Sequence, residues 1–331
     1  MSGIRAPEDL AAFFGPRSIA VVGASRDPTK VGGSVVANLR AAGFEGRVWP
    51  VNPKADVVHG LPAAASLLAI DGPVDLAVIA VPAPAVLPAL KECVAKGIRG
   101  AVVISAGFRE AGDAGRAREA ELRAWLRGQP IRVLGPNCLG WIRPSRRLNA
   151  TFAPGMPPAG GIPFLSHSGA LATAILDWAS TRRFGFSFFA TLGNQADLTE
   201  SDVLEAAAND PETRVIVAYL EGLADGRRFF EALRATTPHK PVVLLKAGRG
   251  EPPVDRTALA ETISRVGQLA VDCPDLVELD LNPLVATSTG VIAVDARATL
   301  DGLAVAGTST GPTPGSISPR QDNRQSFDET T

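Results

Sequence analysis

The chain is poor in the residues that support redox, metal and acid–base chemistry. Its 331 residues include three Cys, three His and one Tyr. The cysteines, Cys93, Cys138 and Cys273, have no pairable spacing and form no Cys-x-x-Cys motif, which predicts a reducing compartment, the cytoplasm. With so few candidates, each His has to be weighed as a catalytic group.

Other absences narrow the class of protein further. No apolar run approaches the length of about 18 residues that a membrane helix needs, and the N-terminus has no basic-then-apolar signal segment. The net charge of −1 argues against nucleic acid or a membrane surface as a partner. Hydrophobic residues make up 46% of the chain, enough for the cores of two domains. We therefore expect a soluble protein.

The sequence is organised around a short apolar strand that runs through a Gly turn into a helix. Residues 19–22 are the strand, Gly23, Ala24 and Ser25 the turn, and Gly32-Gly33 open the helix. Backbone N–H groups at such a turn attract phosphate, and Gly lets the backbone approach a ligand closely. Only one Gly follows the strand directly, so the dinucleotide fingerprint Gly-x-Gly-x-x-Gly is not met. Taken alone, the turn favours an ordinary βα connection.

Strand-like and helix-like segments then alternate as far as Leu134. This alternation predicts a parallel, doubly wound α/β sheet, whose ligands bind beyond the carboxyl ends of the strands. The predicted strands are 19–22, 46–51, 76–81, 101–105 and 131–134, and the predicted helices are 33–42, 85–96 and 114–126.

The residues after these strands are small, Pro or hydrogen-bonding at every strand end. The ends are 23–25, 52–54, 82–84, 105–108 and 135–140. A long ligand could lie across such a rim, with Lys54 as its one cation for a phosphate. Gly and Pro also punctuate ordinary βα turns, which explains any one end well but all five together poorly.

A second parallel α/β unit begins near Pro163, after a Pro- and Gly-rich linker at residues 154–161. Its predicted strands are 161–165, 186–191, 215–220 and 242–246, and its predicted helices are 170–181, 201–208 and 226–235. A Ser-His-Ser-Gly turn, residues 166–169, joins the first of these strands to the first helix.

Several segments resemble the NDP-forming acyl-CoA synthetases, which include the ADP-forming acetate–CoA ligases and are related to succinyl-CoA ligase. They are residues 135–140, 148–152, 166–169 and the Leu-Gly-Asn-Gln-Ala-Asp run at 192–197, and the likeness extends from about Phe13 to Arg249. The resemblance implies a Rossmann-like CoA-binding domain at 1–145 and a flavodoxin-like, succinyl-CoA-ligase-type domain at 146–250.

The resemblance implies CoA as the ligand of the first domain. Its phosphates would face the Gly23 turn and Lys54, its adenine would lie against the end of the third strand, and its thiol would lie near the end of the fifth. The implied CoA-binding residues are Gly23, Ala24, Ser25, Lys54, Val81, Pro82, Ala83, Asn137 and Cys138. The residues at the strand ends, considered without the resemblance, predict a ligand at the same positions.

The family joins an acid and CoA, with conversion of ATP to ADP and phosphate, through a transiently phosphorylated histidine. Helix N-termini and a glutamate steady the phosphorylated ring. By resemblance, Ser166 and Ser168 belong to one such helix N-terminus, and Glu221 is the glutamate.

The chain departs from the family after residue 249, because the expected phosphohistidine loop is missing. Residues 251–305 instead resemble the terminal fragment of the family's ATP-grasp domain, in which Asn282 and Asp295 match Mg²⁺ ligands, with ADP or ATP as the nucleotide. The chain thus resembles a fused synthetase with an internal deletion, joined near Gly250. Residues 306–331, rich in Ser, Thr, Gly and Pro, are predicted to be a disordered tail.

His167 lies in a turn that looks like the phosphohistidine turn, but its flanking residues match an earlier helix of the family, where Gln or Arg usually stands. We therefore favour a residue near the site at the start of a helix over a phosphoacceptor. His59 and His239 are predicted to lie in loops. Cys138 has no His or Asp partner in the sequence pattern, which favours a ligand-facing or packing role over a nucleophile.

Two functions from different classes stay open. The first is the CoA-binding chain of an acid–CoA ligase that needs a separate ATP-grasp subunit and forms a homo- or hetero-oligomer. The second is a CoA- or acyl-CoA-binding protein without turnover, which the missing loop favours for the chain alone. A dehydrogenase is a distant third, since no acidic residue follows the second strand to hold a ribose.

Overall fold

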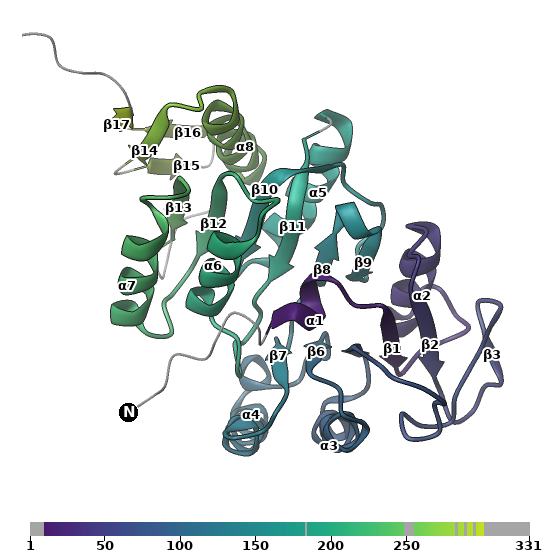
Figure 1. Cartoon of the computed structure of the whole chain (residues 1–331). Coiled ribbons are helices and arrows are strands. Elements are labelled where there is room, and N and C mark those ends of the chain that lie inside the picture. The colour runs from purple at the N-terminus through teal and green to yellow at the C-terminus, as the bar shows by residue number, and fades with distance from the viewer. Residues whose placement is uncertain are drawn as a thin grey trace, which may run out of the picture. The chain divides into compact units, whose positions relative to one another are not determined.

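The computed structural model describes residues 10–182, 184–247, 255–281, 284–287, 290–293 and 296–300. Its first sheet contains β1 (Ser18–Val22), β2 (Arg47–Val51), β5 (Leu76–Ile79), β6 (Gly100–Val103) and β7 (Arg132–Leu134). All neighbouring pairs are parallel, in the order β2-β1-β5-β6-β7 (Figure 1). The doubly wound parallel sheet predicted for this part of the chain is confirmed, with strand limits that differ by one or two residues.

Helices cover both faces of the first sheet because its strands are apolar on both sides. One face packs against α3 (Val86–Lys96) and α4 (Asp113–Leu126), through residues such as Leu90 and Leu122. The opposite face packs against α2 (Val31–Ala41) and against the second half of the chain. A short hairpin, β3 (Val57–Val58) and β4 (Leu61–Pro62), follows β2.

The second sheet has the order β13-β12-β10-β11-β8-β9. Four parallel strands, β10 (Ala159–Ser166), β11 (Phe186–Thr191), β12 (Ile216–Leu220) and β13 (Val242–Lys246), follow the prediction closely. On one face lie α6 (Glu200–Asn209) and α7 (Gly226–Thr236), and on the other α5 (Gly169–Arg182) and α8 (Arg256–Asp272) (Figure 1).

A hairpin that the sequence did not reveal completes the second sheet. β8 (Gly140–Arg143) pairs antiparallel with both β11 and β9 (Leu148–Thr151). Its residues are buried on both sides and show no alternation of polar and apolar positions. The linker predicted at 154–161 is therefore too long, because β10 already begins at Ala159. The predicted domain limit at residues 145 and 146 falls in the turn of this hairpin.

The C-terminal part of the described chain begins with α8, which Asp255 caps by accepting a hydrogen bond from the Ala258 amide at 2.9 Å. Leu259, Ala260 and Ile263 of α8 are buried in the core that lies beneath β10 and β12. Two antiparallel pairs follow: β14 (Leu276–Leu281) with β17 (Ala296–Leu300), and β15 (Leu284–Thr287) with β16 (Gly290–Ala293). The predicted Mg²⁺ ligands Asn282 and Asp295 lie outside the described residues.

An aromatic cluster joins the start of the chain to the second sheet. Phe13 and Phe14 of α1 (Ala11–Phe14) contact Trp141 of β8 with ring centroids 5.6 and 5.2 Å apart. Trp141 in turn stacks on Phe188 of β11 at 4.7 Å. No helix within the described ranges is long and apolar enough to cross a membrane.

Trp141 is 1% exposed, so its removal would leave a cavity between the two halves of the chain. We predict that Trp141→Ala lowers the free energy of unfolding by about 3–5 kcal/mol, as expected for a large buried aromatic side chain. Phe152→Ala is the control, since Phe152 is 40% exposed and should cost far less. Denaturant titration measures both, and equal losses would contradict the prediction.

Candidate functional site

The first candidate site lies where the strand order of the first sheet reverses. The chain leaves β1 towards β2 on one side, and β5 flanks β1 on the other. In open α/β sheets such a switch point forms a crevice at the carboxyl ends of the strands, and ligands bind there. The structure places the predicted residues Gly23, Ala24 and Ser25 after β1 and Val81, Pro82 and Ala83 after β5, so the two sets lie at the same edge of the sheet, after neighbouring parallel strands.

Three glycines make the turn after β1 compact. Gly23 has φ +87°, and a Cβ there would lie 2.5 Å from the Ala80 carbonyl oxygen. A Cβ on Gly32 would lie 2.1 Å from the Gly23 oxygen, and one on Gly33 would lie 2.0 Å from the Asp27 oxygen. The start of α2 therefore packs closely against the turn, and a side chain at any of these three positions would collide with the backbone.

Asn52 ties the end of β2 to this turn. Its Nδ2 donates to the Ala24 carbonyl at 2.7 Å, and its Oδ1 accepts from the Lys54 amide at 2.8 Å. The sequence predicted Lys54 as the one cation among these strand ends. Lys54 is exposed, but a second cation lies beside it. Arg26 donates to the Lys54 carbonyl at 3.4 Å, so a second positive charge stands beside the Gly23 turn. Arg26 was overlooked because it lies in the loop beyond the strand end.

The end of β5 is shaped by its neighbour β6. Ser105 donates its hydroxyl to the Val81 carbonyl at 2.6 Å, and a Cβ on Gly107 would lie 3.0 Å from the Ala83 Cβ. Ala83 is buried, whereas Val81 is half-buried and Pro82 exposed. Val81 and Pro82 thus offer apolar surface to a ligand, and Ala83 supports them from within.

Asn137 and Cys138, predicted near the thiol end of CoA, have opposite environments. Asn137 is exposed with φ +59°, and its Nδ2 donates to Asn194 Oδ1 at 3.3 Å. The Cys138 thiol is buried, donates to the Val103 carbonyl at 3.3 Å, and has its pKa raised to about 12 by that burial. Of the two roles left open for Cys138, the structure therefore favours packing.

The Leu-Gly-Asn-Gln-Ala-Asp segment at 192–197 is the contact between the two sheets. Asn194 is 5% exposed, and its Nδ2 donates to Glu110 Oε2 at 2.6 Å and to Glu119 Oε2 at 2.8 Å. Its amide donates to the Pro136 carbonyl at 2.8 Å. Gly193 is required here, because a Cβ would lie 2.2 Å from the Pro136 oxygen. The sequence marked this segment as specific but assigned it no role.

The hydrogen bonds at this contact stabilise the charged form of Glu110. Burial alone would raise the pKa of Glu110, but hydrogen bonds from Asn194 and from the amides of Phe108 and Gly107 outweigh burial and hold the pKa below its ordinary value. The stability contributed by these bonds is therefore present above the ordinary carboxyl pKa and is lost as the pH falls through the lowered value.

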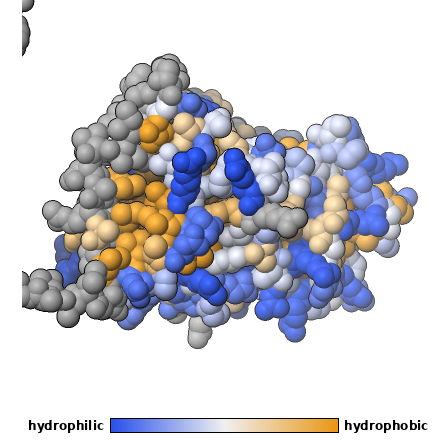
Figure 2. Space-filling model, turned by 90° about the horizontal axis from the view of Figure 1, so that it is seen from above, coloured by the Kyte–Doolittle hydropathy of each residue, from blue (hydrophilic) through white to orange (hydrophobic). Residues whose placement is uncertain are grey.

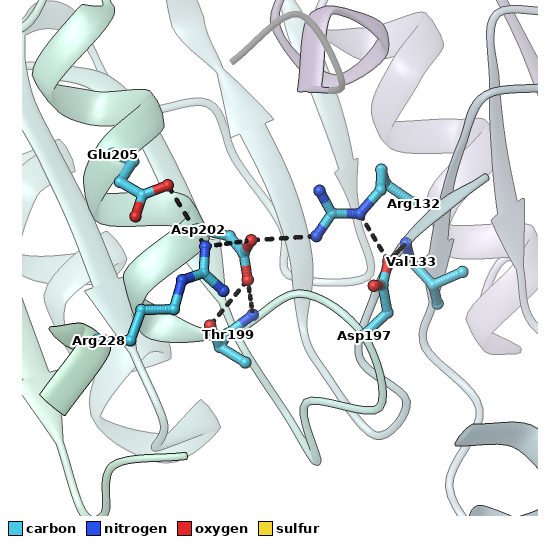
Figure 3. A network of polar contacts seen from close by, with 7 residues as sticks. All are labelled: Arg132, Val133, Asp197, Thr199, Asp202, Glu205 and Arg228. Atoms are coloured by element: carbon cyan, nitrogen blue, oxygen red, sulfur yellow. Dashed lines mark hydrogen bonds and ion pairs between the residues drawn. The ribbon is translucent and has the colours of Figure 1, made fainter. Parts of the chain in front are cut away.

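A buried ion-pair network forms a second link beside the first (Figure 3). Arg132 of β7 donates to Asp197 at 3.0 Å and to Asp202 of α6 at 3.1 Å. Asp202 also accepts from Arg228 of α7 at 2.9 Å and from the Thr199 hydroxyl at 2.7 Å. Burial would raise the pKa of Asp202, but these partners lower it. One arginine of the first sheet is thus fixed to two elements of the second half.

The second candidate site lies at the carboxyl ends of β10 and β12. Ser166 is fully buried and its hydroxyl donates to the Ser168 carbonyl at 2.9 Å, while the Ser168 hydroxyl accepts from the Leu171 amide at 3.3 Å at the start of α5. His167 Nδ1 accepts from the Glu221 amide at 3.1 Å. The four predicted residues Ser166, His167, Ser168 and Glu221 are therefore brought together.

Two charged residues that the sequence analysis did not name belong to the same place. Lys246, the last residue of β13, donates to the Glu221 carbonyl at 3.2 Å. Glu200 is fully buried and accepts from the Ala224 amide at 2.8 Å and from the Gln195 side chain. Asn194 and Gln195 are adjacent, so one turn contacts Asn137 at the first site and Glu200 at the second.

Two hollows lie away from both sites. One of 680 Å³ lies at the amino ends of the first sheet, lined by Arg17, Arg99 and Arg132 among others. Another, of 790 Å³, lies between α4 and α7. The first is at the edge of the sheet opposite to the crevice where ligands of such sheets bind. The described residues contain no group of three or more His, Cys, Asp or Glu that could hold a metal ion.

Comparisons with known proteins agree with this architecture. A CoA binding domain model matches residues 17–144, and a model of the succinyl-CoA ligase like flavodoxin domain matches residues 159–271. The chain is 46% identical over 242 residues to the ADP-forming acetate–CoA ligase I of Archaeoglobus fulgidus, which covers 73% of this chain and 35% of that protein.

Two matches come from separate subunits of Pyrococcus furiosus enzymes. The alpha subunit of ADP-forming acetate–CoA ligase II is 43% identical over 258 residues, 78% of this chain and 56% of the subunit. The beta subunit of ADP-forming acetate–CoA ligase I is 43% identical over 67 residues, 20% of this chain and 29% of the subunit. The chain thus spans from a third to little more than half of the length of its long matches.

Among solved structures, the dinucleotide-forming acetyl-coenzyme A synthetase 1 of Ca. Korarchaeum cryptofilum, in complex with phosphate and ADP, is similar with a TM-score of 0.70. The two are 38% identical, over 79% of this chain and 57% of that one. Fold and matches together define a chain with a CoA-binding domain followed by a succinyl-CoA-ligase-like flavodoxin domain. It belongs to the NDP-forming acyl-CoA synthetases, the family of the ADP-forming acetate–CoA ligases, and the resemblance seen in the sequence is confirmed.

Asn194 provides the sharpest test of the contact between the sheets. Asn194→Asp would place a third carboxylate beside Glu110 and Glu119, and we predict a loss of about 3 kcal/mol or more in the free energy of unfolding at pH 7. The new carboxyl would have a raised pKa in the folded state, so the deficit should shrink as the pH falls towards 5.

The control is Asn209→Asp, because Asn209 is exposed and contacts only its own helix through a 2.7 Å bond to the Glu205 carbonyl. It should change stability by no more than about 0.5 kcal/mol at either pH. Thermal unfolding at the two pH values compares the variants. A deficit for Asn194→Asp that does not depend on pH would contradict the assignment.

Proposed function

We propose that this chain is the CoA-binding chain of an NDP-forming acyl-CoA synthetase, an acid–CoA ligase that depends on a separate ATP-grasp chain for the nucleotide. The observation that carries the proposal is the set of residues that the strand ends bring together at the switch point. There the turn formed by Gly23, Ala24 and Ser25, the cations Lys54 and Arg26, and the apolar Val81 and Pro82 lie at one edge of the sheet. This combination fits the phosphates and the adenine of CoA.

The residues that would contact CoA follow from this fit. The Gly23 amide donates to the Val51 carbonyl at 3.1 Å, so the amides of Ala24, Ser25 and the start of α2 would hold the phosphates, with Lys54 neutralising them. Asn137, exposed at the end of β7, would lie near the thiol. CoA would supply the thiol that accepts the acyl group, and the chain would bind and orient it.

The chain itself holds no residue that matches the family's phosphohistidine. Its three His are His59, His167 and His239, and all precede the end of β13. In the proposed reaction Ser168 and Glu221 would form the place where the phosphoryl group is received, and the phosphohistidine would come from elsewhere. The alternative is a CoA- or acyl-CoA-binding protein without turnover. The missing phosphohistidine favours this alternative for the chain on its own.

The match to a beta subunit supports an ATP-grasp chain as the partner. The alpha-subunit match and the 67-residue beta-subunit match are together almost as long as the chain. We propose that residues 251–305 are an ATP-grasp fragment after an internal deletion, with Asn282 and Asp295 as Mg²⁺ ligands for ADP or ATP. The domain limits at 145, 250 and 305, the cytoplasmic location and an oligomeric state belong to the same proposal.

The surface of β13 supports a partner independently. Among the described strands β13 is the edge of the second sheet, and its apolar residues are incompletely covered, with Leu244 36% exposed. Seen from above, apolar surface gathers on the left, the side on which β13 lies in Figure 1, while much of the remaining face is polar (Figure 2). An ATP-grasp chain that docks there would cover it.

We predict that the chain binds CoA and that Lys54→Ala weakens binding by about 1–2 kcal/mol, the contribution of one charge-assisted hydrogen bond. Lys91→Ala on α3 is the control, since Lys91 is also an exposed lysine but lies away from the crevice. Calorimetric titration measures both. Absence of CoA binding at millimolar concentration, or unchanged affinity in Lys54→Ala, would refute the site.

We further predict that the purified chain forms no acyl-CoA from acetate, CoA, ATP and Mg²⁺. The reason is that neither a complete ATP-grasp domain nor the phosphohistidine is present in its sequence. Formation of acyl-CoA together with ADP and phosphate by the chain alone, followed by chromatography, would show that the missing parts are not needed.

A further inference from the structure

Four arginines line a further hollow, which lies at the amino ends of β1 and β2. The hollow has a volume of 360 Å³, and the arginines are Arg17, Arg47, Arg146 and Arg147. Among the described residues that line it, Glu45 supplies the one carboxylate. The whole chain has a net charge of −1, so this excess of positive charge is local. A local excess of one sign favours a ligand of the opposite sign.

The four arginines come from three segments that the fold holds together. Arg17 precedes β1, and its carbonyl accepts from the amide of Arg47, the first residue of β2, at 2.9 Å. Arg146 and Arg147 belong to the turn between β8 and β9. This turn lies against the loop after α2, because a Cβ on Gly43 would be 3.8 Å from the Arg147 side chain. The backbone therefore fixes the points from which all four side chains extend.

Two of the arginines are also held by their side chains. The guanidinium carbon of Arg47 lies 5.0 Å from the centre of the Trp49 ring. This contact uses the face of the guanidinium, and the N–H groups in its plane are still able to donate to an anion. Arg147 lies 3.5 Å from Glu45 in a pair that is largely exposed, so Glu45 neutralises little of the charge of the hollow.

The other charges of the hollow have no carboxylate to balance them. In the part of the chain that the structure describes, Arg17, Arg47 and Arg146 form no ion pair. Asp75 is close to Arg17, but its Oδ2 accepts from the Arg17 amide at 2.7 Å and from the Ser18 hydroxyl at 3.2 Å. Like charges that gather without a counter-charge repel one another, and a bound anion would remove this repulsion.

The size and the donors of the hollow indicate the class of anion. A volume of 360 Å³ is at the lower end of the range of about 300–1,000 Å³ that is common for small-molecule pockets. A guanidinium matches two oxygens of a phosphate in its plane. One carboxylate or one phosphate cannot pair with four arginines from three directions, whereas two linked phosphoryl groups present enough oxygens.

The hollow is separate from the place proposed for CoA. Gly23 and Lys54 follow the carboxyl ends of β1 and β2, whereas Arg17 and Arg47 lie at the amino ends of the same strands. β1 has five residues, so at about 3.3 Å per residue the two edges are roughly 15 Å apart.

We propose that this arginine-lined hollow is a second binding site, for a small anion with two or more linked phosphoryl groups. The anion joins the loops before β1 and β2 to the turn between β8 and β9, and so connects the first sheet to a hairpin of the second. The proposal rests on the arginines and the hollow and does not depend on the function proposed above.

The first test is calorimetric titration of the full chain with inorganic pyrophosphate in the absence of divalent cations. Arg47→Gln and Arg146→Gln each remove one charged donor and should weaken binding by about tenfold. Arg234→Gln is the matched control, since Arg234 is also an exposed arginine but lies on α7, and it should bind as the wild type does. No binding at millimolar pyrophosphate, or equal affinity of all three variants, would overturn the proposal.

The second test checks the class of ligand. Inorganic phosphate has one phosphoryl group, and citrate has only carboxylates, so both should bind at least tenfold more weakly than pyrophosphate. Citrate that binds as tightly as pyrophosphate would contradict a phosphoryl ligand. A polyglutamate peptide that binds more tightly than pyrophosphate would show instead that the hollow receives an acidic protein segment.

The third test separates this site from the one proposed for CoA. Lys54→Ala should leave the affinity for pyrophosphate unchanged, and Arg146→Gln should leave the affinity for CoA unchanged. Pyrophosphate binding that is lost in Lys54→Ala and kept in Arg146→Gln would place the ion at the CoA site and refute the second site. A chain that binds pyrophosphate at the arginines but does not bind CoA would refute the proposed function alone.

Discussion

The structure depends on the contact that Asn194 makes with the first half of the chain. Its side-chain amide satisfies two carboxylates, Glu110 and Glu119, and its backbone amide meets the Pro136 carbonyl. None of these partners is near it in sequence. Glu119 is buried and Glu110 is exposed, so Asn194 links a carboxylate inside the protein to one at its surface, and hydrogen bonds to charged groups are strong. The turn that carries Asn194 therefore fixes the end of β7 against the second sheet. This places Asn137 at one end of the turn and Glu200 at the other.

The remaining links between the halves follow from this placement. The aromatic stack on Trp141 fills the space between α1 and β11, and the Arg132 network ties β7 to α6 and α7. Apolar side chains make up most of the contact area between the two halves. The buried charged groups fix how the halves fit together, since any shift would leave these charges unpaired. The two candidate sites are thus held by one frame, with the turn that carries Asn194 and Gln195 in contact with both.

Local pattern predicted much of this arrangement. Residues 186–191 and 242–246 were predicted as strands and are β11 and β13, because apolar β-prone runs between turns report directly on buried parallel strands. The Gly23 turn and Val81-Pro82 were placed at one rim because strand ends of a parallel sheet meet at one edge. The β8–β9 hairpin was missed, since its four-residue strands are buried on both faces and carry no alternation. Asn194, Glu200 and Lys246 could not be assigned roles, because their partners are distant in sequence and only the fold brings them together.

We propose that CoA lies across the switch point with its thiol end directed at the turn that joins the two sites. A crystal structure of the chain with CoA tests it most directly. We predict that the phosphates lie against the turn formed by Gly23, Ala24 and Ser25, at the amides of Ala24 and Ser25, and that the thiol lies beside Asn137. CoA bound instead in the hollow between α4 and α7, which is lined by Arg123, Arg127 and Arg228, would contradict the claim.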